Sequence, residues 1–203
     1  HKAANEEAFK KPEGMNAMFS PFTPPQIEYT DALMQDIVNS SDVAVVTIGR
    51  NSGEGGDRVV KDDWLLSQLE QEMLTKTTEA FHKAGKKVVV VLNIGGVIET
   101  ASWKAQPDAI LLAWQGGQEG GNAVADILDG NVNPSGKLTM TFPVNIEDHA
   151  SHANFPLDGK PMQMTDMLWG KDEKPEDEQE KDVDFTTYEE GIYVGYRHFD
   201  TQK

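Results

Sequence analysis

The sequence predicts an α/β domain whose mainly parallel sheet has helices on both faces. Short apolar runs occur at 43–48, 88–92 and 109–114, and the first two are rich in β-branched residues. Such continuous runs are typical of strands buried on both faces. Segments with helical spacing, 27–39 and 67–84, precede the first run and separate the first two. Strands that alternate with helices form βαβ units and a parallel sheet.

Local signals at the helix ends support these assignments. Ser67 followed three residues later by Glu70 is a capping box, which predicts a helix start. Gly85 can end that helix. The sequence also predicts a short helix at 98–103 and another at 122–128, closed by Gly130.

Two further strands are expected in the second half of the chain. The segment 138–142 is apolar and stops at Pro143, and the segment 192–196 has a strand-like pattern. These assignments place one domain at 26–203, preceded by a polar, proline-rich linker or extended arm at 1–25. An acidic loop is expected around 166–187, because 172–184 holds eight acids and two lysines, a composition typical of a solvated excursion.

Composition excludes several classes of function. The net charge of −16 argues against a nucleic-acid surface and against docking on anionic lipid, and it is compatible with a neutral substrate. No apolar run approaches the roughly 20 residues that span a bilayer. The absence of cysteine excludes disulfides and thiolate metal sites. His149 and His152 lack carboxylates at ligand spacing, so a metal site is not expected.

In a parallel sheet, function resides in the loops that follow the carboxyl ends of the strands. The first such loop, 49–63, contains the run SGEGGDR, in which Glu54 lies between two glycines. Glycine permits close approach of the backbone to a ligand, so this loop could present a general acid to a cleft. Arg50, Asp57 and Arg58 could orient this carboxyl or shift its pKa. An ordinary solvated loop explains the same residues equally well.

The third loop, 115–121, is rich in glycine and leads into a helix. Backbone amides at a helix start can bind an anion, but a tight turn between strand and helix also requires glycine. Trp114, at the start of this loop, could stack on a sugar ring. A tryptophan after a buried strand more often belongs to the core.

Five segments together carry a resemblance to one family. In chain order they are 52–58 (SGEGGDR), 89–95 (VVVLNIG), 113–121 (AWQGGQEGG), 133–143 (NPSGKL with TFP) and 188–197 (YEEGIYVGYR). Their order over 41–201 resembles that of the C-terminal α/β domain of family 3 glycoside hydrolases of the β-glucosidase type.

The resemblance implies a two-domain enzyme that hydrolyses terminal β-linked glycosides, most often glucosides, with retention. A barrel domain of the same parent chain would supply an aspartate nucleophile, and the present domain would supply the acid/base glutamate, Glu54. Arg50, Asp57 and Arg58 would support the loop. Ser52 and Trp114 would contact substrate or the domain interface. No cofactor is implied.

The sequence contains neither the barrel nor its nucleophile motif, so we expect this chain alone to be inactive. It begins at His1 without a charged and then apolar leader, which suggests a piece of a longer protein. A periplasmic or secreted location would suit a polysaccharide-degrading enzyme, although no residue indicates it. Two alternatives stay open: a catalytically inert carbohydrate-binding domain, and an α/β domain that binds an anion or nucleotide at 115–121.

Overall fold

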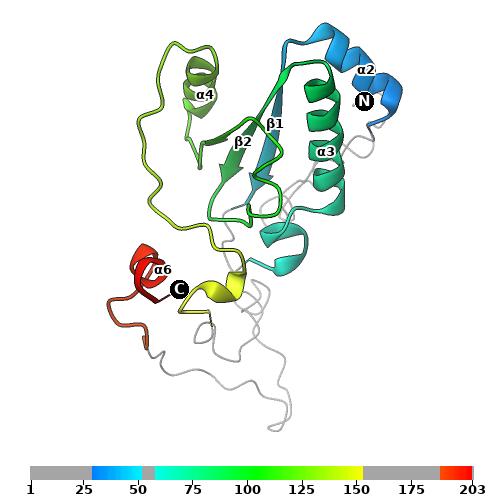
Figure 1. The fold of residues 1–203 in the computed structure, drawn as a ribbon. Helices are drawn as coiled ribbons and strands as arrows, with labels where there is room; N and C mark the ends of the chain where they lie inside the picture. The colour runs from blue at the N-terminus through cyan, green and yellow to red at the C-terminus, as the bar shows by residue number, and fades with distance from the viewer. Residues whose placement is uncertain (1–28, 52–57, 153–187, 203) are drawn as a thin grey trace, which may run out of the picture.

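The computed structural model describes residues 29–51, 58–152 and 188–202. Its helices and strands follow the chain in an order that opens with alternating α and β elements (Figure 1). They are α2 (Asp31–Ser40), β1 (Val43–Arg50), a helical turn at Val60–Trp64, α3 (Gln68–Lys83), β2 (Lys87–Ile94), β3 (Ala109–Leu112), α4 (Gly120–Leu128), a short 3₁₀ turn at Ile146–Asp148 and α6 (Tyr196–Gln202). The predicted arm at 1–25 and the acidic loop at 166–187 lie outside the described residues.

The sheet has the strand order β1-β2-β3, and both pairings are parallel. Val43 pairs with Lys87 at one end of the β1–β2 ladder and Arg50 pairs with Ile94 at the other. The predicted α/β class and parallel sheet are therefore confirmed. Because the strands are parallel, the segments that follow β1, β2 and β3 all begin at the same edge, which is at the bottom of Figure 1 for β1 and β2.

Helix α3 begins and ends where the sequence predicts. The Ser67 hydroxyl accepts from the Glu70 amide, the Glu70 carboxylate accepts from the Ser67 amide, and the two contacts complete the capping box. Gly85, with φ of 72°, follows the helix in a conformation that glycine adopts without a steric penalty. The helix packs on β1 and β2 through Leu74 and Phe81, whose side chains are fully buried.

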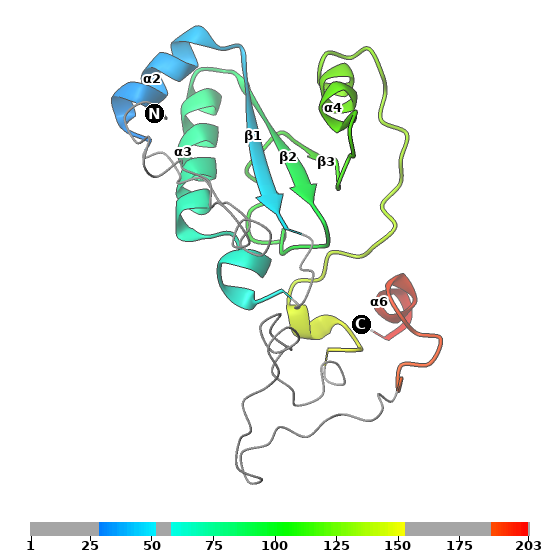
Figure 2. The ribbon, with the colours of Figure 1, turned by 180° about the vertical axis from the view of Figure 1, so that it is seen from behind.

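The core lies between this helical layer and one face of the sheet. Alternate residues of β1 point into it, as expected for a strand with two unlike faces. Helix α2 packs on α3, whereas α4 lies beyond β3, away from α3 (Figures 1 and 2), and has no buried residue. On the opposite face of β1, Val43 and Val45 remain 46% and 47% exposed.

The predicted helix at 98–103 is wrong, because this segment forms turns. The Glu99 carboxylate accepts from the amide and the hydroxyl of Ser102 at 2.7 Å each. The Trp103 indole donates to the Glu99 carbonyl at 2.8 Å. These local side-chain bonds compete with regular helical hydrogen bonding.

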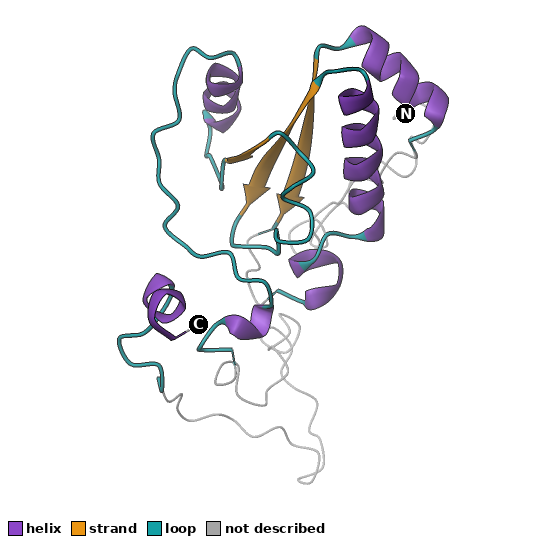
Figure 3. Cartoon of the chain, viewed as in Figure 1, coloured by secondary structure: helices purple, strands orange, loops and turns teal. Residues whose placement is uncertain are grey.

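The predicted strands at 138–142 and 192–196 are also wrong. In the structure 138–142 runs as a loop without pairing to the described sheet (Figure 3). Gly191 and Gly195 adopt φ of 56° and 57°, which interrupts extended backbone, and α6 begins at Tyr196. An apolar pattern indicates that a segment could be a strand, but whether it pairs with a sheet depends on its tertiary context.

Candidate active site

The first two loops meet at the carboxyl edge of the sheet. Arg58 donates from Nε to the Val97 carbonyl at 2.9 Å and from Nη2 to the Gly96 carbonyl at 3.2 Å. A Cβ on Gly96 would lie 3.5 Å from the Arg58 guanidinium, so the backbone of the second loop lies directly against this side chain. The residue that follows segment 52–57 is thereby fixed to the loop after β2.

Arg50, the last residue of β1, is directed into the domain. Its two Nη atoms donate to the two Glu70 carboxylate oxygens at 2.7 and 2.8 Å, and its Nε donates to the Asp63 carbonyl at 2.8 Å. The side chains of Arg50 and Glu70 are 8% and 11% exposed. This buried, bidentate ion pair fixes the end of β1 on the start of α3. Arg50 therefore has a structural role rather than a substrate contact.

The Glu70 carboxyl is held in its charged form. Burial opposes its ionisation, but the hydrogen bonds from Arg50 and from the Ser67 amide, with the positive charge of Arg50, outweigh burial and lower its pKa. Glu70 therefore serves both as the second member of the capping box and as the counter-ion of Arg50. Its position three residues after Ser67 identifies the first role from sequence, and no spacing rule identifies the second.

Asp63 is a site residue that the sequence analysis did not identify. Its Oδ1 accepts from Arg58 Nη1 at 2.6 Å and lies 3.8 Å from Arg50 Nε, while its Oδ2 accepts from the Val59 amide at 3.3 Å. Asp63 thus lies between the two arginines that flank segment 52–57. Thirteen residues separate Arg50 from Asp63 in the sequence, and an irregular turn brings them together, so periodicity could not have revealed the contact.

The helical turn at Val60–Trp64 directs Asp63 toward these arginines. Asp62 adopts φ of 61°, a conformation uncommon for residues other than glycine but accessible to Asp and Asn. The Trp64 amide donates to the Val59 carbonyl at 2.9 Å, and the Trp64 side chain is 2% exposed. The buried indole anchors the turn, so the carboxylate before it has a fixed position.

His149 packs against the buried Trp64 of this turn. Its ring contacts Trp64 edge-on at 6.3 Å and Phe199 at 5.9 Å between centroids. Burial lowers its pKa, and the nearby His152 acts in the same direction, so the neutral ring is favoured. In the part of the chain that the structure describes, no group of three or more His, Asp or Glu side chains could hold a metal ion.

The third loop has the geometry of a tight turn. A Cβ on Gly116 would lie 2.8 Å from the Gly120 Cα, and Gly117 adopts φ of 65°, so both glycines are required by the backbone. Glu119 stands at the start of α4 and accepts from the Asn122 amide group at 2.6 Å. A carboxylate at this helix start repels an anion, so the geometry favours the turn over an anion site.

Trp114 belongs partly to the core. It adopts φ of 52°, is partly buried against the core and lies 6.1 Å from Phe142 in a tilted arrangement. This ring contact connects the third loop to 138–142. The structure therefore assigns Trp114 a packing contact, and its predicted contact with substrate or an interface stays a prediction.

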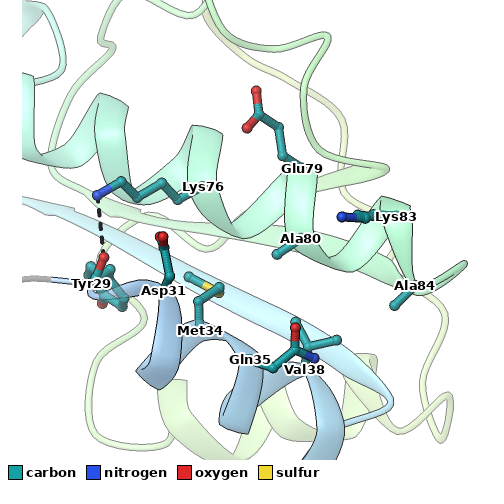
Figure 4. A pocket seen from close by; sticks show the side chains of 10 residues that line it. All are labelled: Tyr29, Asp31, Met34, Gln35, Val38, Lys76, Glu79, Ala80, Lys83 and Ala84. Atoms are coloured by element: carbon teal, nitrogen blue, oxygen red, sulfur yellow. Dashed lines mark hydrogen bonds between the residues drawn. The ribbon is translucent and has the colours of Figure 1, made fainter.

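A groove of about 430 Å³ lies between α2 and α3 (Figure 4). Lys76 donates to the Tyr29 carbonyl at 3.3 Å across one end of it. The residues around it belong to the two helices and the segments adjoining them, and none belongs to a loop that follows a strand. The groove is therefore separate from the predicted site.

Of the predicted site residues, the structure brings Arg50 and Arg58 together around Asp63, with Trp114 on a different loop. Ser52, Glu54 and Asp57 lie outside the described residues. No helix in the described ranges has both the length and the apolar character needed to cross a membrane.

Comparison with known proteins identifies the family. Residues 4–196 match the model of the glycosyl hydrolase family 3 C-terminal domain. The chain belongs to this family. The family 3 domain is 36% identical over 194 residues to β-glucosidase A of Butyrivibrio fibrisolvens, covering 83% of the chain and 20% of that protein. It is 33% identical to an exo-α-(1→6)-L-arabinopyranosidase of Bifidobacterium breve, covering 93% of the chain and 22% of that protein.

A solved structure agrees with the fold. β-Glucosidase 3B from Thermotoga neapolitana, in complex with α-D-glucose, matches with a TM-score of 0.72 and 38% identity, covering 98% of the chain and 26% of that structure. The chain spans about a fifth of the length of the curated relatives it matches. The resemblance to family 3 and the α/β class expected from sequence are confirmed. The roles of individual residues stay predictions.

Proposed function

We propose that this family 3 domain supplies the acid/base carboxylate of a retaining β-glucosidase, and that the carboxylate is Glu54. The nucleophile lies on a barrel domain of the same parent enzyme. One observation supports this assignment most strongly: the nearest arginines on either side of segment 52–57 are both anchored at the carboxyl edge of the parallel sheet. Arg50 is fixed on Glu70, and Arg58 is fixed on the loop after β2. Active sites of open α/β sheets occur at this edge.

Retaining hydrolysis requires two carboxyl groups about 5–5.5 Å apart. One carboxylate attacks the anomeric carbon while the protonated Glu54 donates its proton to the departing glycosidic oxygen. In the second step Glu54, now ionised, takes a proton from water as the water oxygen attacks the anomeric carbon and displaces the nucleophilic carboxylate. The Glu54 pKa must lie above its usual range in the first step, which closure against the barrel and the negative charge of the nucleophile would favour.

The substrate class is a terminal β-linked glucoside or oligosaccharide. The β-glucosidase relatives support glucose as the sugar. The arabinopyranosidase relative is nearly as similar, which supports a division of labour in which this domain delivers the proton while residues elsewhere select the sugar. The net charge of −16 suits a neutral substrate.

The test is Glu54→Gln in the full-length enzyme. Because glutamine cannot donate the proton, kcat/KM for cellobiose or an alkyl glucoside should fall by about 10²–10⁴-fold. The loss should be much smaller in the glycosylation step for a dinitrophenyl glucoside, whose leaving group needs no proton. Added azide should accelerate release of the glycosyl–enzyme and yield the β-glycosyl azide.

The matched control is Glu72→Gln, an exposed glutamate of α3, which should leave these rates unchanged. The chain without a barrel domain should show no hydrolysis. Full activity of the Glu54→Gln enzyme on cellobiose would refute the proposal.

A further inference from the structure

We infer that Asp63 is a positioning residue for the acid/base glutamate, because its carboxylate links Arg50 and Arg58, the nearest arginines on either side of segment 52–57. This inference rests on the proposed function and adds to it a residue that the family resemblance did not indicate. Asp63 acts through Arg50 and Arg58, not through the substrate.

Asp63 contacts the two arginines in different ways. Its closest contact is with Arg58, at 2.6 Å. Its backbone carbonyl accepts from Arg50 Nε at 2.8 Å, so Asp63 binds one arginine through its side chain and the other mainly through its backbone. Its Oδ2 also accepts from the Val59 amide, which fixes the carboxylate to the chain that leaves Arg58.

The electrostatics require an anion at this position. Arg50 and Arg58 both approach the Asp63 carboxylate, with closest nitrogen–oxygen distances of 3.8 and 2.6 Å, and without it their positive charges would repel each other. Arg50 has a second counter-ion in Glu70. Arg58 otherwise has only the carbonyls of Gly96 and Val97 among its described contacts. Loss of the Asp63 charge should therefore release the Arg58 side more than the Arg50 side.

Fixing both flanks of a short segment restricts where its residues can lie. A displacement of about 1 Å at a catalytic group can cost as much as 100-fold in rate. A misplaced acid/base group affects bonds that need protonation and hardly affects bonds that do not. A general loss of folded structure lowers both rates equally, so the dependence on leaving group separates positioning from folding.

The experiment compares Asp63→Asn with Asp62→Asn in the full-length enzyme. Both changes remove one negative charge at adjacent positions. Asp62 is exposed, and asparagine tolerates its positive φ. Asp63→Asn should lower kcat/KM for an alkyl glucoside by about tenfold or more, and lower it for a dinitrophenyl glucoside by less than about twofold. Asp62→Asn should change neither rate by more than about twofold.

If Asp63→Asn does not fold, Arg58→Lys provides the same test. It keeps the charge but loses the planar fork that reaches Asp63 and the two carbonyls, and it should show the same selective loss. Equal losses on both substrates, or no loss, in the variant that folds would overturn the inference. Glu54→Gln is assayed beside these variants. If it loses activity while Asp63→Asn retains it, the positioning role fails and the proposed function stands. Full activity of Glu54→Gln would refute both.

Discussion

Two aspartates at opposite edges of the sheet form similar clusters. Asp63, at the carboxyl edge, accepts from Arg58 and the Val59 amide and lies near Arg50. Asp108, at the amino edge just before β3, accepts from Lys87 at 2.7 Å, the Val88 amide at 2.9 Å and His82 at 2.9 Å. Each carboxylate therefore joins two basic side chains and one backbone amide.

The two clusters differ in what they connect. Asp108 joins the end of α3, the start of β2 and the start of β3, which are all regular elements. Asp63 joins Arg50, the last residue of β1, to Arg58, the residue that follows segment 52–57. The same chemistry thus joins regular elements at one edge and, at the other, links the arginines on either side of segment 52–57. The predictions below separate stability from catalysis accordingly.

The largest effect on stability is expected at the buried Arg50–Glu70 pair, at the carboxyl edge of the sheet. Glu70→Ala removes the carboxylate half of the capping box and leaves the Arg50 charge without its bidentate partner. It should lower the free energy of unfolding of this domain by about 2–3 kcal/mol and also reduce activity. Thermal or denaturant unfolding measures the change. Glu72→Ala, two residues along α3 and exposed, should cost less than about 0.5 kcal/mol; equal losses would contradict the role of the Arg50–Glu70 pair.

A smaller effect on stability, without an effect on chemistry, is expected at the amino edge. Asp108→Asn should lower the midpoint of thermal unfolding by about 2–4 °C and increase hydrogen exchange at the Val88 amide, which loses a charged acceptor. It should leave the ratio of rates on alkyl and dinitrophenyl glucosides unchanged. A selective loss like that expected for Asp63→Asn would remove the distinction between the two edges.

The smallest expected effect is on the stability of the domain at acidic pH. Hydrogen bonds from Lys87, the Val88 amide and His82 lower the pKa of Asp108 well below its usual range. A carboxyl whose pKa is lower in the folded state stabilises the fold above its unfolded pKa, and this contribution is lost as pH falls. The unfolding midpoint should therefore decline as pH falls below about 4, and Asp108→Asn should decline less steeply. Parallel curves for the two proteins would contradict this.

The sequence predicted the elements whose signals are local. The capping box at Ser67, the helix that follows it and three parallel strands were predicted, and all appear in the structure. The same apolar signal misled at 138–142, which does not pair with the described sheet. In the second half of the chain Leu138 is 68% exposed and Ile192 is 69% exposed, which shows that composition alone does not make a strand.

The candidate site was predictable only in part. Arg50 and Arg58 were identified as supporting residues from their places beside the glycine-rich run, and the structure joins them through Asp63. Neither Asp63 nor the pairing of Glu70 with Arg50 could be predicted, because both depend on an irregular turn that includes a positive φ at Asp62. Glu54, Ser52 and Asp57 lie outside the described residues, so their roles stay predictions.

The most direct test of the central claim is a crystal structure of the full-length enzyme with a non-hydrolysed β-glucoside analogue bound. The account predicts that a Glu54 carboxyl oxygen lies within hydrogen-bond distance of the glycosidic oxygen, and that its carboxyl group lies about 5–5.5 Å from a barrel carboxylate. Another acid in that position, with Glu54 directed away from the bound sugar, would contradict it.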